Sequence, residues 1–253
     1  MIGASAWGLP PDASLHGWRV DWLMNTTSVF VAIMFLATLL WILIACVRHG
    51  RAHRAHYDHG SARPQMIKAA LLSTAIFGVV DGNLLVHGIP DLDQAFWNFE
   101  RAEADPHAVR IEVNAHQWAL DARYAGPDGK FGTADDVVSL NDIRVPLGVP
   151  VLIELASTDV IHCFSLPNFR VKQDAVPGMI NRLWFQAKKT GEFDIACAQH
   201  CGVHHYKMRG QLTVLASQEY AAWMAQAAVL AQSSYDAGDT TAHWAWAWER
   251  GNK

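Results

Sequence analysis

Charged residues are scarce in this sequence, since Asp, Glu, Lys and Arg make up only 17% of its 253 residues. Ordinary globular proteins carry about 25%. The balance of the two signs is also uneven, because residues 91–253 contain 20 acidic but only 14 basic side chains. A deficit of basic charge argues against nucleic-acid binding, which needs a positive surface to neutralise phosphates. It is compatible with an ordinary solvated surface, or with a basic partner that is steered by charge.

Long runs without charge are present instead. Residues 29–47 contain no charged side chain, and about 20 apolar residues suffice for a helix to cross a lipid bilayer. A second run, residues 69–90, is interrupted by Asp81 and Asn83. We predict two transmembrane helices, over about residues 27–48 and 66–89. A buried core helix is the alternative for each run, and the polar residues make it more plausible for the second.

A cleavable signal peptide is not indicated, because the first 28 residues lack a basic start and no small-residue cleavage pattern follows the first run. Basic residues gather between the two runs, whereas Arg19 is the only one in the first 28 residues. The positive-inside rule therefore predicts a cytoplasmic loop, with both chain ends on the outer, periplasmic side of a bacterial inner membrane. The basic residues of this loop are Arg48, Arg51, Arg54, Arg63 and Lys68.

Short runs rich in β-branched and aromatic residues follow the apolar segments and alternate with turn signals. This spacing predicts an all-β sandwich or small barrel. We expect residues 1–90 to form an N-terminal segment with a two-helix transmembrane hairpin, and residues 91–253 to form the β domain. The predicted strands lie within residues 108–120, 121–125, 136–140, 142–146, 149–157, 159–166, 180–187, 191–197 and 210–216.

A helix is predicted near the end of the chain, over residues 217–232, with Ser217 as its N-cap. The tail that follows carries tryptophans at alternate positions, which is compatible with an edge strand, a membrane-interface anchor or a subunit contact. These tryptophans are Trp244, Trp246 and Trp248.

The turn GPDGKFGTADD, residues 126–136, contains three carboxylates, at Asp128, Asp135 and Asp136. They are possible calcium ligands, but their order differs from that of an EF-hand loop. A solvated hairpin is the simpler interpretation.

Two of the four cysteines lie in the stretch CAQHCGVHHYKM, residues 197–208. The periplasm would allow a disulfide between Cys197 and Cys201, but four residues is a poor spacing and leaves His205 and Met208 unexplained. Zinc binds thiolates and imidazoles and has little use for a thioether. Cysteine, histidine and methionine together favour copper.

The number of thiolates suggests two copper ions. A single blue-copper ion needs one thiolate and two imidazoles, whereas this stretch offers two thiolates. Two thiolates that bridge two ions account for the surplus, and each ion then needs one imidazole and one weak donor. His162 is the best candidate for the second imidazole, with His200 and His204 as alternatives. The stretch itself supplies the other donors, namely His205, Met208 and the backbone carbonyl of Gln199.

The motif C-x-x-x-C-G-x-x-H-x-x-M occurs together with HQW at 116–118, DVIHCF at 159–164 and VKQDAVPG at 171–178. In this order the motifs resemble subunit II of haem–copper cytochrome c oxidases, and the resemblance extends over nearly the whole chain. It implies two transmembrane helices, a cupredoxin-like periplasmic domain and a dinuclear copper centre called CuA. The copper ligands that it implies are His162, Cys197, Gln199 (through its carbonyl), Cys201, His205 and Met208.

The resemblance also implies a function. Subunit II accepts electrons from cytochrome c and passes them to haem in subunit I, where O2 is reduced, and Trp118 matches the tryptophan at which electrons enter. Two departures stand out. Ala119 and Leu120 replace the aromatic pair usual after HQW, and Gln199 replaces an acidic residue whose side chain reaches a magnesium shared with subunit I. A magnesium at this interface is therefore doubtful.

Three other functions are weighed against this one. The CuA subunit of a nitric-oxide reductase would have the same architecture and stays open. A membrane-tethered copper-binding or delivery protein is disfavoured, because a tether needs only one helix. A thiol–disulfide exchanger is disfavoured because the cysteines do not form C-x-x-C, and the absence of C-x-x-C-H argues against a fused cytochrome c domain.

Overall fold

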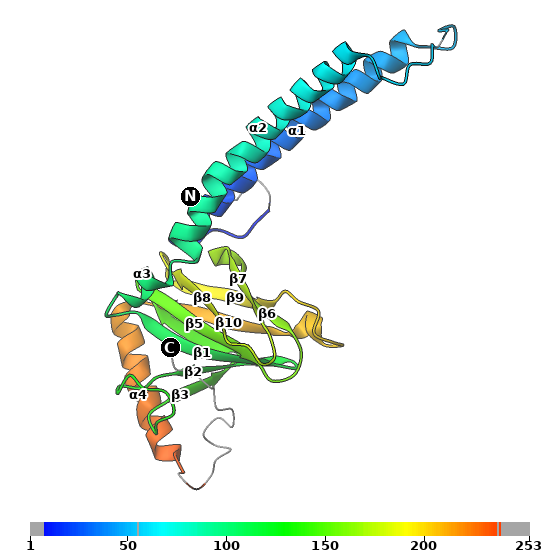
Figure 1. The fold of residues 1–253 in the computed structure, drawn as a ribbon. Helices are drawn as coiled ribbons and strands as arrows, with labels where there is room; N and C mark the ends of the chain where they lie inside the picture. The colour runs from blue at the N-terminus through cyan, green and yellow to red at the C-terminus, as the bar shows by residue number, and fades with distance from the viewer. Residues whose placement is uncertain (1–7, 55, 237, 239–253) are drawn as a thin grey trace. The chain divides into compact units, whose positions relative to one another are not determined.

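The computed structural model describes residues 8–54, 56–236 and 238, which divide into two units (Figure 1). One unit comprises residues 19–95 and contains two long apolar helices. The other comprises residues 8–18 together with the described residues from Phe96 onward, and it is rich in β-strands. The predicted combination of two apolar helices with a β domain is confirmed.

The two apolar runs form α1 (Gly17–Arg48) and α2 (Arg63–Asp91). Both helices are long and apolar enough to cross a membrane. At 1.5 Å per residue, the 32 residues of α1 extend about 48 Å. Most of their large apolar side chains are exposed, as expected for helices that lipid or a partner covers. The pair is joined by an ion pair between Arg19 and Asp91 and by an edge contact between Trp22 and His87.

The described residues before α1 belong to the β domain rather than to the hairpin, which differs from the division predicted at residue 90. Ala13 donates its backbone N–H to the carbonyl of Asn168 at 2.8 Å, and Leu15 donates to Gln186 at 2.9 Å. The Asp12 carboxylate forms an ion pair with Lys188. These contacts join positions more than 150 residues apart, so local sequence patterns cannot predict them.

In the part of the chain that the structure describes, ten strands form two five-stranded sheets, whose arrangement can be followed in Figure 1. The parallel pairs are β1 with β5 and β4 with β10, and the remaining neighbours are antiparallel. The first sheet has the order β3 (Val137–Leu140), β2 (Ala119–Tyr124), β1 (Val109–His116), β5 (Pro150–Ser157) and β8 (Asn181–Gln186). The second has the order β4 (Asp142–Pro146), β10 (Arg209–Leu215), β9 (Gly191–Cys197), β6 (His162–Leu166) and β7 (Val171–Ala175). Short helical turns are η1 (Leu92–Phe96), α3 (Phe99–Glu103), η2 (Pro167–Phe169) and η3 (His205–Lys207).

The core lies between the two sheets. Alternate residues of each strand point inward, as the period of two requires, so Val113 of β1, Ile153 of β5 and Leu212 of β10 are fully buried in one cluster. Burial of each such side chain contributes about 1.5–3 kcal/mol. The bulkiest apolar members of this cluster are Tyr124, Phe164, Phe169, Ile111, Ile143, Ile153, Leu155, Leu166, Ile195 and Leu212.

The strand predicted over residues 108–120 is two strands. The chain turns at Gln117 and Trp118, whose peptide bond is cis, and β2 then pairs antiparallel with β1. No Gly, Pro, Asn or Asp marks this turn, so the usual turn signals are missing. Gln117 donates its backbone N–H to the carboxylate of Asp159 at 2.6 Å. The turn is thus held by a residue more than 40 positions away.

The predicted C-terminal helix is present as α4 (Ser217–Ser234), but its N-cap is Ala216 and not Ser217. Ala216 donates its backbone N–H to the Glu219 carboxylate at 3.2 Å, which satisfies a group that the helix itself cannot pair. Trp223 of α4 packs edge-on against Tyr124, with ring centroids 5.3 Å apart. The predicted tryptophan tail, residues 244–248, lies outside the described residues.

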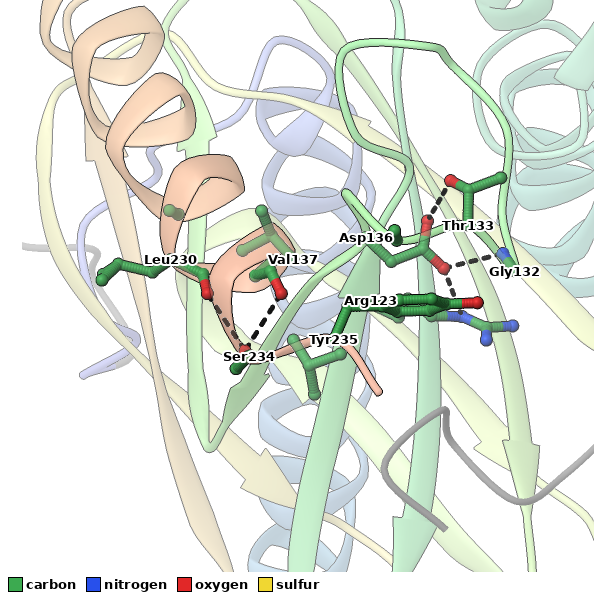
Figure 2. Close-up of a pocket in the computed structure, with 12 residues that line it drawn as sticks. Arg123, Gly132, Thr133, Asp136, Val137, Leu230, Ser234 and Tyr235 are labelled. Carbon is green, nitrogen blue, oxygen red and sulfur yellow. Dashed lines mark hydrogen bonds and ion pairs between the residues drawn. The ribbon is translucent and has the colours of Figure 1, made fainter. Parts of the chain in front are cut away.

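The turn over residues 126–136 folds back on itself. Asp135 accepts a hydrogen bond from Thr133 at 2.8 Å, and Asp136 accepts one from the backbone of Gly132 at 2.7 Å. Within the described part of the chain, the carboxylates of this turn do not meet as a metal cluster. The turn borders a cavity of about 340 Å³ beside the C-terminal end of α4, with Arg123 and Asp136 on its wall (Figure 2).

A buried ion pair lies on the outer face of the first sheet, and we predict that breaking it destabilises the domain. Arg123 Nε donates to Glu112 at 2.8 Å, and the two side chains are 8% and 1% exposed. Arg123→Met removes the guanidinium group that faces the buried Glu112 carboxylate, so unfolding free energy should fall by about 3–5 kcal/mol. Urea unfolding of the full chain in detergent, followed by fluorescence, measures this loss.

The exposed pair between Arg110 and Glu154 is the matched control, since Arg110 is 51% exposed. Arg110→Met should cost less than about 1 kcal/mol. If the two variants lost equal amounts of unfolding free energy, burial of the ion pair would not determine its contribution to stability. The double variant Glu112→Leu, Arg123→Met should recover part of the stability, because the Glu112 charge is removed together with Arg123 and only Asp136 then loses its ion pair with Arg123, at 3.8 Å.

Candidate metal centre

Three neighbouring strands of the second sheet bring the cysteine stretch and His162 together. Cys197 is the last residue of β9, Met208 immediately precedes β10, and His162 is the first residue of β6. The order β10–β9–β6 places these strand ends side by side. The backbone N–H of Cys197 donates to the carbonyl of Met208 at 3.3 Å, which closes the loop between them.

The donor atoms of the six predicted residues lie close together. The two cysteine sulfurs are 3.7 Å apart, and Cys201 Sγ is 3.6 Å from Nδ1 of His205. Cys197 Sγ is 3.2 Å from the carbonyl oxygen of Gln199. On the other side, Met208 Sδ is 3.7 Å from Cys201 Sγ and 3.1 Å from Nδ1 of His162. His162, Cys197 and Cys201 form the one cluster of three His, Cys, Asp or Glu ligand atoms found among the described residues.

The His162 ring is oriented by Asp159. The ring is completely buried, and its Nε2 lies 2.8 Å from the Asp159 carboxylate. Because an ionised carboxylate only accepts hydrogen bonds, Nε2 carries the proton and Nδ1 presents a lone pair to the cluster. Burial raises the pKa of Asp159, but hydrogen bonds from His162 and from the backbone of Val160 and Gln117 outweigh it and leave the pKa below its usual value. This pairing is typical of a metal-ligating histidine.

Burial disfavours the charged form of the Cys201 thiol. Cys201 is 2% exposed, and its pKa is raised to about 11 by burial and by the neighbouring Cys197. Two adjacent thiolates are therefore stable here only with a cation between them, since a metal ion displaces the protons from its sulfur ligands. Two sulfurs, two imidazole nitrogens, a thioether and a carbonyl form a soft donor set, which suits copper better than zinc, calcium or magnesium.

The alternative histidines have other contacts. The His204 ring packs edge-on against Trp118, with centroids 4.5 Å apart, and the His200 side chain is exposed with its ring 5.5 Å from that of His205. The side chain of Gln199 is also exposed. Its carbonyl oxygen is the group that lies 3.2 Å from the Cys197 sulfur.

Trp118 contacts the loop through a hydrogen bond to a cysteine residue. Its Nε1 donates to the carbonyl oxygen of Cys201 at 3.3 Å, and the side chain of Gln117 donates to the same oxygen at 2.8 Å. The indole ring is half-buried. It therefore reaches from the surface to the backbone of a residue in the cluster.

Glycine is required at position 202, where the cysteine loop passes the turn at Gln117 and Trp118. We predict that Gly202→Ala disturbs the centre. The Gly202 φ of +112° is one that other residues rarely adopt, and a Cβ there, 2.8 Å from Nε2 of Gln117, would push the end of that side chain off its hydrogen bond to the Cys201 carbonyl. Gly148→Ala is the matched control, since Gly148 has a φ of +76° but no atom within 4 Å of the added Cβ. Strain alone costs about 1–3 kcal/mol. Thermal unfolding should show a larger loss at Gly202, and equal losses would exclude the close contact as a cause.

Sequence reasoning missed Asp159 and Gln117 as parts of this site. Asp159 stands three residues before His162 in the motif DVIHCF, so a carboxylate close to a candidate ligand was the available signal. The role of Gln117 follows only from the turn after β1, which the sequence does not mark.

Comparison with known proteins decides the family. A sequence model described as "Cytochrome C oxidase subunit II, periplasmic domain" matches residues 93–214. The "Alternative cytochrome c oxidase subunit 2" of Bradyrhizobium diazoefficiens is 31% identical, over 93% of this chain and 92% of that protein. The chain belongs to the cytochrome c oxidase subunit II family. The resemblance seen in the motifs is confirmed, and the chain is a subunit of a cytochrome c oxidase.

A second subunit II protein also matches over most of its length. The "Probable cytochrome c oxidase subunit 2" of Rickettsia bellii is 33% identical over 86% of this chain and 82% of that protein. Among solved structures, the periplasmic domain of subunit II of cytochrome oxidase from Bradyrhizobium japonicum is 30% identical, with a TM-score of 0.42, over 47% of this chain and 92% of that one. Subunit II proteins bind copper, and the His162, Cys197 and Cys201 group can hold a metal ion.

Proposed function

We propose that this chain is the electron-entry subunit of a respiratory haem–copper oxidase, with a dinuclear CuA centre in the loop after β9. The observation that carries the proposal is the pair of cysteine sulfurs 3.7 Å apart, with His205 Nδ1 3.6 Å from Cys201 Sγ and a ring nitrogen of His162 within 4.8 Å of both sulfurs. When bound, the two copper ions would take up one electron from a donor and release it to haem in subunit I. The ligands would be His162, Cys197, Gln199 (carbonyl), Cys201, His205 and Met208.

We infer from the distances how these donors would be divided between two ions. His162 and Met208 adjoin each other, so they suit one ion. His205 adjoins the Cys201 sulfur and the Gln199 carbonyl adjoins the Cys197 sulfur, so these two donors would serve the second ion. Both thiolates are then shared. This division gives each ion two sulfurs, one imidazole and one weak donor, and no donor is left over.

The residues around the cluster would orient the copper ligands and provide the contact surface for the electron donor. Asp159 holds the His162 ring in one tautomer, while its second carboxylate oxygen accepts the N–H of Gln117. The same carboxylate thus ties the turn that carries Trp118 to a copper ligand. Trp118, half exposed and hydrogen-bonded to Cys201, is the proposed contact for cytochrome c or a similar donor.

The membrane arrangement follows from the basic loop. Arg48, Arg51, Arg54 and Arg63 lie between or at the inner ends of α1 and α2, so we place this loop in the cytoplasm. Two crossings then put both chain ends and the copper domain on the periplasmic side of a bacterial inner membrane. The exposed apolar surface of the hairpin would contact lipid and the other oxidase subunits.

Purification of the native complex tests the function. We expect haem in a partner subunit and oxygen consumption with reduced cytochrome c as donor. A complex that reduces nitric oxide and not O2 would assign the chain to a nitric-oxide reductase instead. Recovery of the chain with copper but without any haem-containing partner would overturn the proposal in favour of a copper-binding protein.

We predict that the complex lacks a tightly bound magnesium at Gln199. A hard cation such as Mg²⁺ favours charged oxygen ligands, and the exposed side chain of Gln199 is a neutral amide. Metal analysis of the purified complex checks this, with Mn²⁺ as the paramagnetic substitute. Gln199→Glu should raise manganese occupancy and leave copper unchanged, because the copper ligand at this position is the backbone carbonyl. One manganese held equally by the unchanged complex would contradict the prediction.

A further inference from the structure

The loop between α1 and α2 carries four histidines that the proposed function does not use. They are spaced H-x-x-x-H-x-x-H-x-x-H, and all four side chains are exposed. The loop belongs to the helical unit and not to the β domain that holds the cysteines. The four residues are His49, His53, His56 and His59.

The first two rings are in edge-to-face contact. The centroids of His49 and His53 are 4.4 Å apart, and their planes are at 85°. His49 lies one residue beyond the end of α1, and the backbone N–H of His53 donates to the carbonyl of Gly50 at 2.9 Å. The turn thus brings together two side chains that a straight extended segment would separate.

The His49 ring is held in the tautomer that a metal requires. Its Nδ1 lies 3.0 Å from the carbonyl oxygen of Ala45. A carbonyl only accepts hydrogen bonds, so Nδ1 carries the proton and Nε2 keeps its lone pair. Histidines that bind metals usually donate their second ring nitrogen to a backbone carbonyl or carboxylate in this way. The bond also caps the end of α1.

The ring of His53 is available for a ligand. Among the residues that the structure describes, its only side-chain contact is the His49 ring, with no hydrogen bond or ion pair. The neighbouring arginines, Arg51 and Arg54, oppose a cation through their charge. At exposed sites, however, water and salt reduce that opposition to about 1 kcal/mol or less. The site therefore needs an ion whose bonds to imidazole outweigh this modest repulsion. Ca²⁺ and Mg²⁺ do not form such bonds.

We propose that His49 and His53 form a chelating pair for a divalent transition-metal ion of the Ni²⁺, Cu²⁺ and Zn²⁺ class. Imidazole nitrogen is a favoured ligand of these ions. His56 and His59 follow on the same loop, but among the described residues neither joins the pair in a cluster of three ligand atoms, and the His59 ring lies 6.0 Å from that of Tyr57. The site is exposed, so the ion exchanges with solution. It is distinct from the copper centre in residues, in chemistry and in structural unit.

Ni²⁺ titration of the full chain in detergent tests this site. His49→Ala and His53→Ala should each weaken Ni²⁺ binding by about tenfold or more, since even loss of an outer hydrogen-bond partner of a ligand costs about that much. Both positions are exposed, so folding should be unaffected, which circular dichroism verifies. His107→Ala is the matched control, because His107 is an exposed histidine of the β domain, and it should leave the affinity unchanged.

Each variant is compared with the unchanged chain, so Ni²⁺ taken up by the cysteine cluster contributes equally to both measurements. The result is therefore independent of the copper proposal. His56→Ala and His59→Ala should give smaller losses than the first pair. The site would be refuted if His49→Ala and His53→Ala bound Ni²⁺ as tightly as the unchanged chain, or if Mg²⁺ at equal concentration displaced Ni²⁺.

Discussion

In a Cys201→Ser variant we expect both copper ions to be lost, and not only one. The sulfurs of Cys197 and Cys201 are 3.7 Å apart, with donors on both sides, so each thiolate would bind both ions. A serine hydroxyl is a hard, weakly acidic group and does not replace a bridging thiolate. Cys197→Ser should have the same effect. Copper analysis and the visible spectrum of the purified chain measure the loss.

Cys46→Ser is the control for this experiment, since Cys46 is an exposed cysteine of α1 outside the cluster. It should keep the full copper content. Met208→Leu provides a graded comparison, because a thioether binds weakly and tunes the potential more than it holds the metal. Retention of one copper ion in Cys201→Ser would show that the Cys201 sulfur does not bridge two copper ions.

Replacement of Trp118 by alanine should reduce turnover with cytochrome c by about tenfold or more, which corresponds to about 1.4 kcal/mol or more in activation free energy. The indole is the half-exposed group that reaches the Cys201 carbonyl, at 3.3 Å, and alanine removes both the contact surface and the link. The copper spectrum should be unchanged, because no donor atom of the cluster belongs to Trp118. Steady-state oxygen uptake measures turnover.

Two further variants refine this test. Trp118→Phe keeps a ring but removes the Nε1 hydrogen bond, so an intermediate rate would separate the two contributions. Trp97→Phe is the matched control at an exposed tryptophan, 66% accessible, and should leave the rate unchanged. Normal turnover in Trp118→Ala would mean that electrons enter elsewhere. Such a result would agree with the absence of aromatic residues next to Trp118, where this chain has Ala119 and Leu120.

The elements that the sequence predicted well are those with a strong local pattern. The charge-free run at 29–47 is part of α1, and the alternating runs at 149–157 and 191–197 correspond closely to β5 and β9. Strand β7, residues 171–175, was not predicted, because its polar sequence VKQDA lacks the alternation of a half-buried strand. Its place is set by pairing with β6.

Features fixed by distant contacts could not be predicted. The turn at Gln117 depends on Asp159, and residues 13–15 attach to the sheet through Asn168 and Gln186. For the metal centre the motifs, through the family resemblance that they carry, supplied all six candidate ligands, which lie on one loop and one strand end. The orientation of His162 by Asp159 needed the structure, because a hydrogen bond depends on side-chain direction and not on spacing alone.

Copper stoichiometry is the most direct test of the central claim. The full chain, expressed without partner subunits and loaded with copper in detergent, should bind two copper ions per chain. Its oxidised form should give a paramagnetic resonance spectrum in which one unpaired electron is shared equally by both copper nuclei. That result follows from two thiolates 3.7 Å apart, flanked by His162 and His205. One copper or one zinc per intact chain, or an electron localised on a single copper nucleus, would contradict a dinuclear centre.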